Sequence, residues 1–155
     1  MKYTYSKKAL KEYLKNGYGE YLFKNADLLL DDCRFQALII EVKAADDAGN
    51  TFVNKVGYDE LSKDNLRIET KFTNYIMPTG ELRLNSAGEN KRNGFDFIRI
   101  IDGINERIFE IPHDVYYERG KFYGNEFKWS ASYNTTDKIQ TGNTQLLFNY
   151  EITQL

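Results

Sequence analysis

The chain has 155 residues, a formal net charge of −2, and 41% hydrophobic and 15% aromatic residues. These values predict a folded globule of one domain and leave too few residues for two sizeable domains. The acidic balance argues against strong, sequence-blind binding of nucleic acid, although a basic cleft on an acidic body remains compatible with specific binding.

A single cysteine, Cys33, and a single histidine, His113, exclude several kinds of site. One cysteine forms no internal disulfide and no thiolate zinc cluster, and one histidine excludes two-histidine metal motifs. A hydrolytic triad would have to use His113, which follows Pro112 in a turn-like setting. No apolar run approaches the roughly 18 residues of a membrane span, and no signal-peptide pattern follows the N-terminus. We expect a soluble, cytoplasmic protein without a membrane partner.

The N-terminal part of the chain is predicted to be helical. Ser6 is a capping-type residue, and Leu10, Tyr13 and Leu14 follow at helical spacing, so a helix should run to about Asn16. The lysines of this segment could meet a DNA backbone, but a solvated face is the simpler interpretation.

A second helix is predicted over residues 34–45, with Asp31 or Asp32 as its N-cap and Gly49 beyond its end. Cys33 would lie on the apolar side of the helix start. An alternative hairpin would set Asp31 opposite Glu41, but its turn would lack glycine, proline, asparagine and aspartate. We therefore place Glu41 and Lys43 on the solvated side of the helix and regard a supporting role for Glu41 near a metal as the weaker alternative. The expected apolar stripe consists of Phe35, Leu38, Ile39 and Val42.

Residues 46–55 are expected to form a loop that leads into a hairpin over residues 56–74. The polar turn is Ser62-Lys63-Asp64-Asn65, and an alternating strand follows it. Period two places Arg67, Glu69 and Lys71 on one face of this strand. A turn centred on Asp64 sets Asp59 opposite Glu69 and Leu61 opposite Arg67.

Two carboxylates that face each other across a hairpin repel, because their Cβ atoms lie about 5 Å apart. A divalent cation between Asp59 and Glu69 would remove the repulsion, and oxygen ligands suit magnesium. Lys71 adds an ammonium on the same face, where it could meet a phosphate or an attacking water. Solvated strand charges on a half-exposed sheet are the alternative interpretation.

Asp59 followed by Glu69-Thr70-Lys71 resembles the D…ExK signature of the PD-(D/E)xK nuclease superfamily. From about residue 33 to about residue 129, the order of elements resembles small homodimeric type II restriction endonucleases of the PvuII kind. The leading proline of the signature is replaced by Tyr58, a position that varies within the superfamily.

This resemblance implies a restriction-endonuclease-like α/β core, with a central mixed β-sheet flanked by helices and additional β structure towards the C-terminus. It implies an Mg²⁺ cofactor, with Asp59, Glu69 and the backbone carbonyl of Thr70 as metal ligands. Lys71 would orient or help deprotonate the water, so that the catalytic set is Asp59, Glu69 and Lys71.

In these relatives the segment after ExK enters the major groove of double-stranded DNA. Arginine suits guanine there and asparagine suits adenine. The related enzymes use histidines in this segment and this chain has none, so a different target is implied. An ordinary surface loop is the alternative. The matching candidates are Arg83, Asn85, Ser86, Asn90, Lys91 and Arg92.

The clearest strand covers residues 95–102, and residues 108–112 return from a turn as its hairpin partner. This buried hairpin should pack beside the hairpin over residues 56–74 in the central sheet. Asp96 and Arg99 interrupt the apolar run, and cross-strand pairing explains them better than catalysis. A last strand is predicted over residues 145–152.

We therefore predict a single nuclease domain over residues 1–155. Residues 1–32 would form a helical arm that supports a homodimer, because one site cuts one strand, and residues 33–155 would hold the catalytic core. The leading hypothesis is a magnesium-dependent restriction-type endonuclease. The alternatives are a structure-selective nuclease of the junction-resolvase or repair kind and a non-catalytic binding domain.

Overall fold

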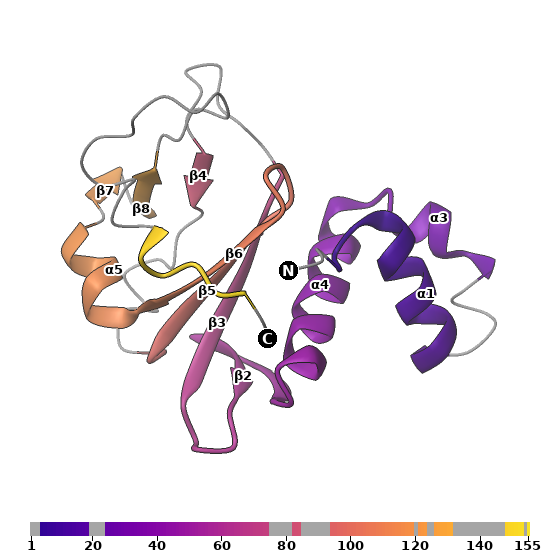
Figure 1. Cartoon of the computed structure of the whole chain (residues 1–155), viewed down its shortest axis with the longest axis horizontal. Coiled ribbons are helices and arrows are strands. Elements are labelled where there is room, and N and C mark those ends of the chain that lie inside the picture. Colours follow the sequence, from indigo (N-terminus) through magenta and orange to yellow (C-terminus); the bar gives the residue numbers. More distant parts are fainter. Residues whose placement is uncertain are drawn as a thin grey trace.

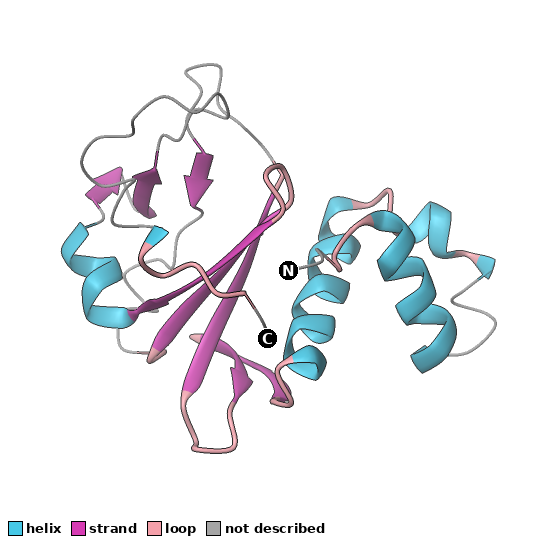
Figure 2. Ribbon diagram, viewed as in Figure 1, coloured by secondary structure: helices cyan, strands magenta, loops and turns pink. Residues whose placement is uncertain are grey.

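The protein is described by a computed structural model that covers residues 4–18, 24–74, 82–84, 94–119, 121–123, 126–131, 148–153 and 155. A mixed sheet separates two layers (Figures 1 and 2). One layer holds α1 (Lys7–Tyr18), α3 (Ala26–Leu29) and α4 (Cys33–Asp47). The other holds α5 (His113–Arg119) and three short strands, β4 (Leu82–Leu84), β7 (Lys121–Tyr123) and β8 (Glu126–Ala131).

The central sheet has five strands in the order β1-β2-β3-β5-β6. Strands β3 and β5 run parallel, and the other neighbours are antiparallel. The predicted α/β class with a mixed sheet and flanking helices is confirmed. The strands are β1 (Thr51–Lys55), β2 (Tyr58–Leu61), β3 (Arg67–Thr73), β5 (Phe97–Asp102) and β6 (Arg107–Pro112).

The hairpin of β2 and β3 has the predicted register, with Leu61 opposite Arg67. The backbone N–H of Ser62 donates to the carbonyl of Leu66 at 2.9 Å, and the Ser62 Oγ accepts from the Leu66 N–H at 3.0 Å. Asn65 has a φ of 60°, a left-handed conformation that asparagine tolerates better than most residues. The turn therefore follows from local side-chain chemistry.

The helix α4 begins as predicted, because the Asp32 carboxylate accepts hydrogen bonds from the N–H groups of Arg34 and Phe35 at 2.9 and 3.3 Å. Two expectations about its faces are wrong. Leu38 is 39% exposed, whereas Lys43 is only 8% exposed. The Lys43 ammonium reaches Asp47 at 2.6 Å and lies over the Tyr5 ring, so its stem is buried without loss of an ionic partner.

The sequence-based interpretation of three other segments is corrected. Cys33 begins α4 in an exposed position. Residues 51–55 form the edge strand β1, because Thr51 and Phe52 pair with β2. Of the strand predicted over residues 145–152, residues 145–147 lie outside the described part of the chain. Phe148 is helical, residues 149–150 form a turn, and Glu151 makes an isolated bridge to Phe109.

Apolar clusters cover both faces of the sheet. The strand β5 contributes Ile98 and Ile100 to the cluster beneath α5, and Ile101 to the cluster beneath α1 and α4. Both Leu10 and Leu14 of α1 are fully buried in the second cluster. Burial on both faces explains why residues 97–102 are almost continuously apolar. Among the described residues, no helix has the length and apolar character that a bilayer crossing requires.

Candidate active site

The β2–β3 hairpin carries the predicted acids. The register that pairs Glu60 with Ile68 brings Asp59 opposite Glu69 at the next position. Asp59 is 6% exposed and Glu69 is fully buried. The Thr70 backbone N–H donates to Asp59 Oδ2 at 2.9 Å, so the Asp59 side chain turns towards the backbone of β3. Two carboxylates are therefore held out of water on neighbouring strands.

Lys71 joins these acids. Its ammonium forms an ion pair with the Glu69 carboxylate, and its side chain is 21% exposed. Burial by itself would lower the pKa of Lys71, but the charges of Glu69 and Asp59 and the hydrogen bond with Glu69 outweigh burial and raise it. The ammonium therefore keeps its proton at neutral pH, which suits a donor and a stabiliser of negative charge.

Glu41 lies on α4 and is partly buried. Its negative charge is the smallest of the causes that raise the pKa of Lys71. The solvated side predicted for Glu41 is therefore only partly exposed, and a supporting role near a metal stays a prediction. The sequence places Glu41 in the helix before the hairpin. Helical periodicity does not predict where that helix packs on the sheet, so it does not predict which strand residues lie near Glu41.

A second ionic cluster lies behind these residues on the α4 side of the sheet. Glu60 is fully buried, and its carboxylate accepts from Arg99 Nη1 with both N···O distances at 2.6 Å. Glu110 accepts from Arg99 Nε and Nη2 at 3.3 and 3.1 Å. The Thr70 hydroxyl donates to Glu60 Oε1 at 2.5 Å, and the Asn50 amide donates to Glu60 Oε2 at 3.0 Å. We call Glu60, Thr70, Arg99, Glu110 and Asn50 the buried network.

The cross-strand pairing predicted for Arg99 is confirmed, because Arg99 and Glu110 are direct partners in the β5–β6 ladder. The central role of Glu60 was missed. Its signal was the hairpin alternation itself, which puts Glu60 on the face opposite Asp59. A buried acid on that face requires a cation or hydrogen-bond donors, and Arg99 lies two strands away in a separate part of the sequence.

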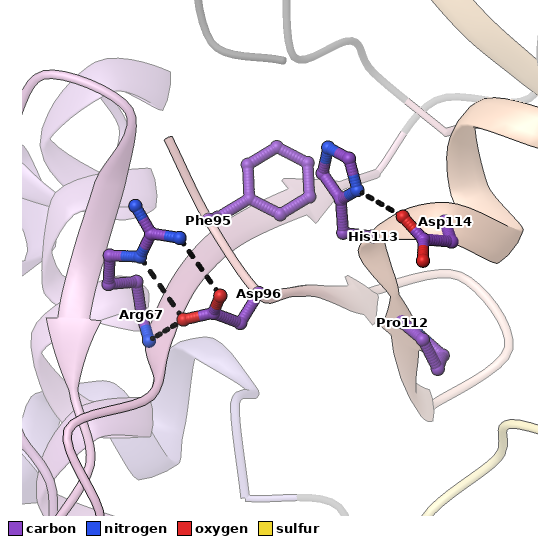
Figure 3. A pocket seen from close by; sticks show the side chains of 6 residues that line it. All are labelled: Arg67, Phe95, Asp96, Pro112, His113 and Asp114. Atoms are coloured by element: carbon purple, nitrogen blue, oxygen red, sulfur yellow. Dashed lines mark hydrogen bonds and ion pairs between the residues drawn. The ribbon is translucent and has the colours of Figure 1, made fainter. Parts of the chain in front are cut away.

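A cavity of about 440 Å³ lies near the start of β3 and β5 (Figure 3). Two pairs of interacting side chains are among its lining residues. Arg67 donates to Asp96 at 2.9 and 3.1 Å, and His113 Nδ1 lies 2.8 Å from Asp114 Oδ1. The hydrogen bond from Arg67 is the main cause that lowers the pKa of Asp96. The pairing predicted for Asp96 is confirmed, and His113 occupies the first position of α5, remote in sequence from the hairpin acids.

The predicted DNA contacts fall mainly outside the described part of the chain. Arg83 belongs to strand β4, of which only the backbone course is described. The other five predicted contacts, Asn85, Ser86, Asn90, Lys91 and Arg92, lie outside the described residues. Their role stays a prediction.

The donor chemistry fits the predicted metal. Asp59 and Glu69 supply buried carboxylate oxygens on adjacent strands, the ligand type that Mg²⁺ prefers, and Mg²⁺ commonly takes only one or two carboxylates. Within the described residues there is no group of three or more His, Cys, Asp and Glu side chains that could enclose an ion. The Thr70 carbonyl as a third ligand stays a prediction.

No protein-family model matches the sequence, and no curated protein matches it. Among solved structures, the chain is similar to a bacterial homing endonuclease, I-Ssp6803I, with a TM-score of 0.46 and 16% sequence identity. The similarity covers 81% of this chain and 84% of that one.

Proposed function

We propose that this chain is a magnesium-dependent endonuclease that hydrolyses phosphodiester bonds in double-stranded DNA. The observation that carries the proposal is the meeting of Asp59, Glu69 and Lys71 on one face of the β2–β3 hairpin. Two buried acids next to one ammonium form an acidic site with a hydrogen-bond donor. A metal ion and an anionic phosphate are complementary to that combination.

Each residue has a chemical task in this proposal. The carboxylates of Asp59 and Glu69 would hold the ion, and Thr70 would add its carbonyl. A bound magnesium ion supplies neutralisation of phosphate charge and lowers the pKa of water. Lys71 donates hydrogen bonds from its ammonium, which orients the attacking water and stabilises the negative charge that grows on the phosphate in the transition state. The raised pKa of Lys71 favours this donor role over removal of a proton.

The negative charge of Glu41 on the helix α4 adds to the charges of Glu69 and Asp59 that raise the pKa of Lys71. In the proposal its charge makes a minor addition to the effect of Glu69 and Asp59 on the ammonium. Its contribution should be smaller than that of Asp59 or Glu69, which belong to the hairpin itself.

The test is a plasmid-nicking assay with MgCl₂. Glu69→Gln and Lys71→Met should each reduce the nicking rate by about 100-fold or more, since each removes one charged group from the reacting centre. Matched controls are Glu118→Gln and Lys63→Met, which make the same changes at exposed positions and should nick like the parent. Melting curves would verify that every variant is folded at the assay temperature. Equal nicking by Glu69→Gln and the parent would refute the assignment.

We propose further that cutting is site-specific and requires two copies of the chain, as in restriction enzymes. One hairpin site serves one strand, so a two-fold dimer would match a symmetric target. Linear duplex DNA should yield discrete fragments in MgCl₂, and light scattering should give twice the chain mass. Cleavage confined to branched DNA would instead indicate a structure-selective nuclease.

A further inference from the structure

The candidate active site and the buried network meet at one residue, Thr70. Its backbone N–H donates to Asp59 at 2.9 Å, whereas its hydroxyl donates to Glu60 at 2.5 Å. Thr70 also stands between Glu69 and Lys71 in the chain. Any displacement of Thr70 therefore reaches Asp59 through a hydrogen bond and Glu69 and Lys71 through the backbone.

Glu60 is itself fixed from several directions. Arg99 contacts both of its oxygens, and Asn50 donates to one of them. Arg99 is held in turn by Glu110 on the far side, so the guanidinium joins β2, β5 and β6. A planar, fully engaged guanidinium has little freedom to rotate. Glu60 and Arg99 are 0% and 2% exposed, which keeps water from replacing these bonds.

We propose that Glu60 and Arg99 are positioning residues for the candidate active site and act on it through Thr70. The inference rests on the proposed function, because it assigns the network a role in cation binding and catalysis. The network holds β3 from the face of the sheet opposite the acids. Loss of the Thr70 hydroxyl bond would let Asp59, Glu69 and Lys71 depart from the arrangement that suits the cation.

Another ion pair of β3 provides the contrast. Arg67 at the start of β3 donates to Asp96, the residue before β5, with N···O distances of 2.9 and 3.1 Å. The Thr70 side chain donates to Glu60, whereas the backbone N–H and the guanidinium of Arg67 donate to Asp96. Variants of the Glu60–Arg99 pair and of the Arg67–Asp96 pair can therefore be compared. The comparison distinguishes a general stabilisation of the sheet from an effect that reaches Asp59 and Glu69 through Thr70.

The experiment compares two threonines of β3. Thr70→Val removes the hydroxyl donor and keeps the backbone N–H that binds Asp59, and Thr70→Ser restores a hydroxyl. Thr73→Val makes the same change at another buried position of the strand. The readouts are the rise in melting temperature during titration with CaCl₂ or MgCl₂, and kcat and KM for nicking. Apparent cation affinity should fall by about 10-fold in Thr70→Val, the lower end of the loss seen when an outer partner of a metal ligand is removed, because the backbone N–H bond to Asp59 remains.

Thr70→Ser should recover most of the affinity that Thr70→Val loses. Thr73→Val should keep the affinity of the parent, and Asp96→Asn should lower the melting temperature without changing cation affinity. Unchanged cation affinity in Thr70→Val, or equal losses in Thr70→Val and Thr73→Val, would overturn the inference, provided that the parent nicks DNA.

If Thr70→Val does not fold, Arg99→Lys serves in its place. Arg99→Lys keeps the positive charge and loses the planar set of N–H donors that binds Glu60 and Glu110. The same loss of cation affinity is expected. A parent that neither nicks DNA nor responds to either cation refutes the proposed function instead.

Discussion

The two faces of the β2–β3 hairpin carry ionic clusters of the same nominal composition. On one face Asp59 and Glu69 accompany Lys71, and on the other Glu60 and Glu110 accompany Arg99. Each cluster combines two acids with one base, yet their surroundings differ. Glu60 accepts hydrogen bonds from Arg99, Thr70 and Asn50, whereas the Lys71 ammonium is a compact charge beside two acids.

The comparison teaches that charge balance alone does not distinguish a structural cluster from a candidate site. A guanidinium presents several donors in a fixed plane and can serve two carboxylates at once, which suits permanent pairing. An ammonium on a flexible stem can turn from a carboxylate to a phosphate or a water. The face with Arg99 is therefore expected to contribute most to stability and to act on chemistry only through Thr70, whereas the face with Lys71 is expected to carry the chemistry itself.

The largest expected effect is on the buried network. Arg99→Met should lower the free energy of unfolding by about 3–5 kcal/mol, because it leaves the Glu60 carboxylate buried without its cation. Urea denaturation followed by circular dichroism measures this change. A loss as small as that of an exposed ion pair would contradict the idea that the Arg99 cluster dominates the stability of the fold.

Lys71→Met should lower the free energy of unfolding in EDTA by about 3 kcal/mol, since Glu69 is fully buried and loses its ammonium. Added MgCl₂ should stabilise this variant more than the parent, because a bound cation would neutralise the acids in place of the ammonium. The measurement is the melting temperature with EDTA and with MgCl₂. An equal response of variant and parent would contradict the idea that ammonium and cation neutralise the same acids.

Asp59→Asn should change the free energy of unfolding in the opposite direction to Lys71→Met. In EDTA it should raise the free energy of unfolding by up to about 1 kcal/mol, because like charges opposite each other are destabilising and the amide oxygen can still accept from Thr70. The same variant should lose most of its stabilisation by MgCl₂. Glu60→Gln is the matched change on the other face, and destabilisation is expected for it.

The smallest effect concerns the Arg67–Asp96 pair, whose side chains are 39% and 34% exposed. Asp96→Asn should cost about 1 kcal/mol or less at neutral pH. The hydrogen bond from Arg67 lowers the pKa of Asp96 from its ordinary value of 3.8. The pair therefore stabilises the fold above about that value and loses its effect as the pH falls through the lowered pKa. Unfolding curves of variant and parent should converge in acid, and a constant difference would contradict the pairing.

Local patterns were sufficient for much of the fold. The N-cap of α4, the turn before Leu66 and the β5–β6 hairpin depend on residues that are close in sequence, so each could be predicted. The facing of Asp59 and Glu69 followed from the same turn. The burial of Lys43 could not be predicted, because the Tyr5 ring that covers it comes from a distant segment.

The alternation of residues in the hairpin could be read from the sequence, and with it the placement of two acids and a lysine on one side. The burial of Glu60 against Arg99 depends on how the strands pack together and could not be read from it. The physical reason is the separation in sequence of the residues that interact. A turn and a two-residue repeat are fixed by neighbouring dihedral angles, whereas the partner of a buried charge depends on which strands and helices pack together.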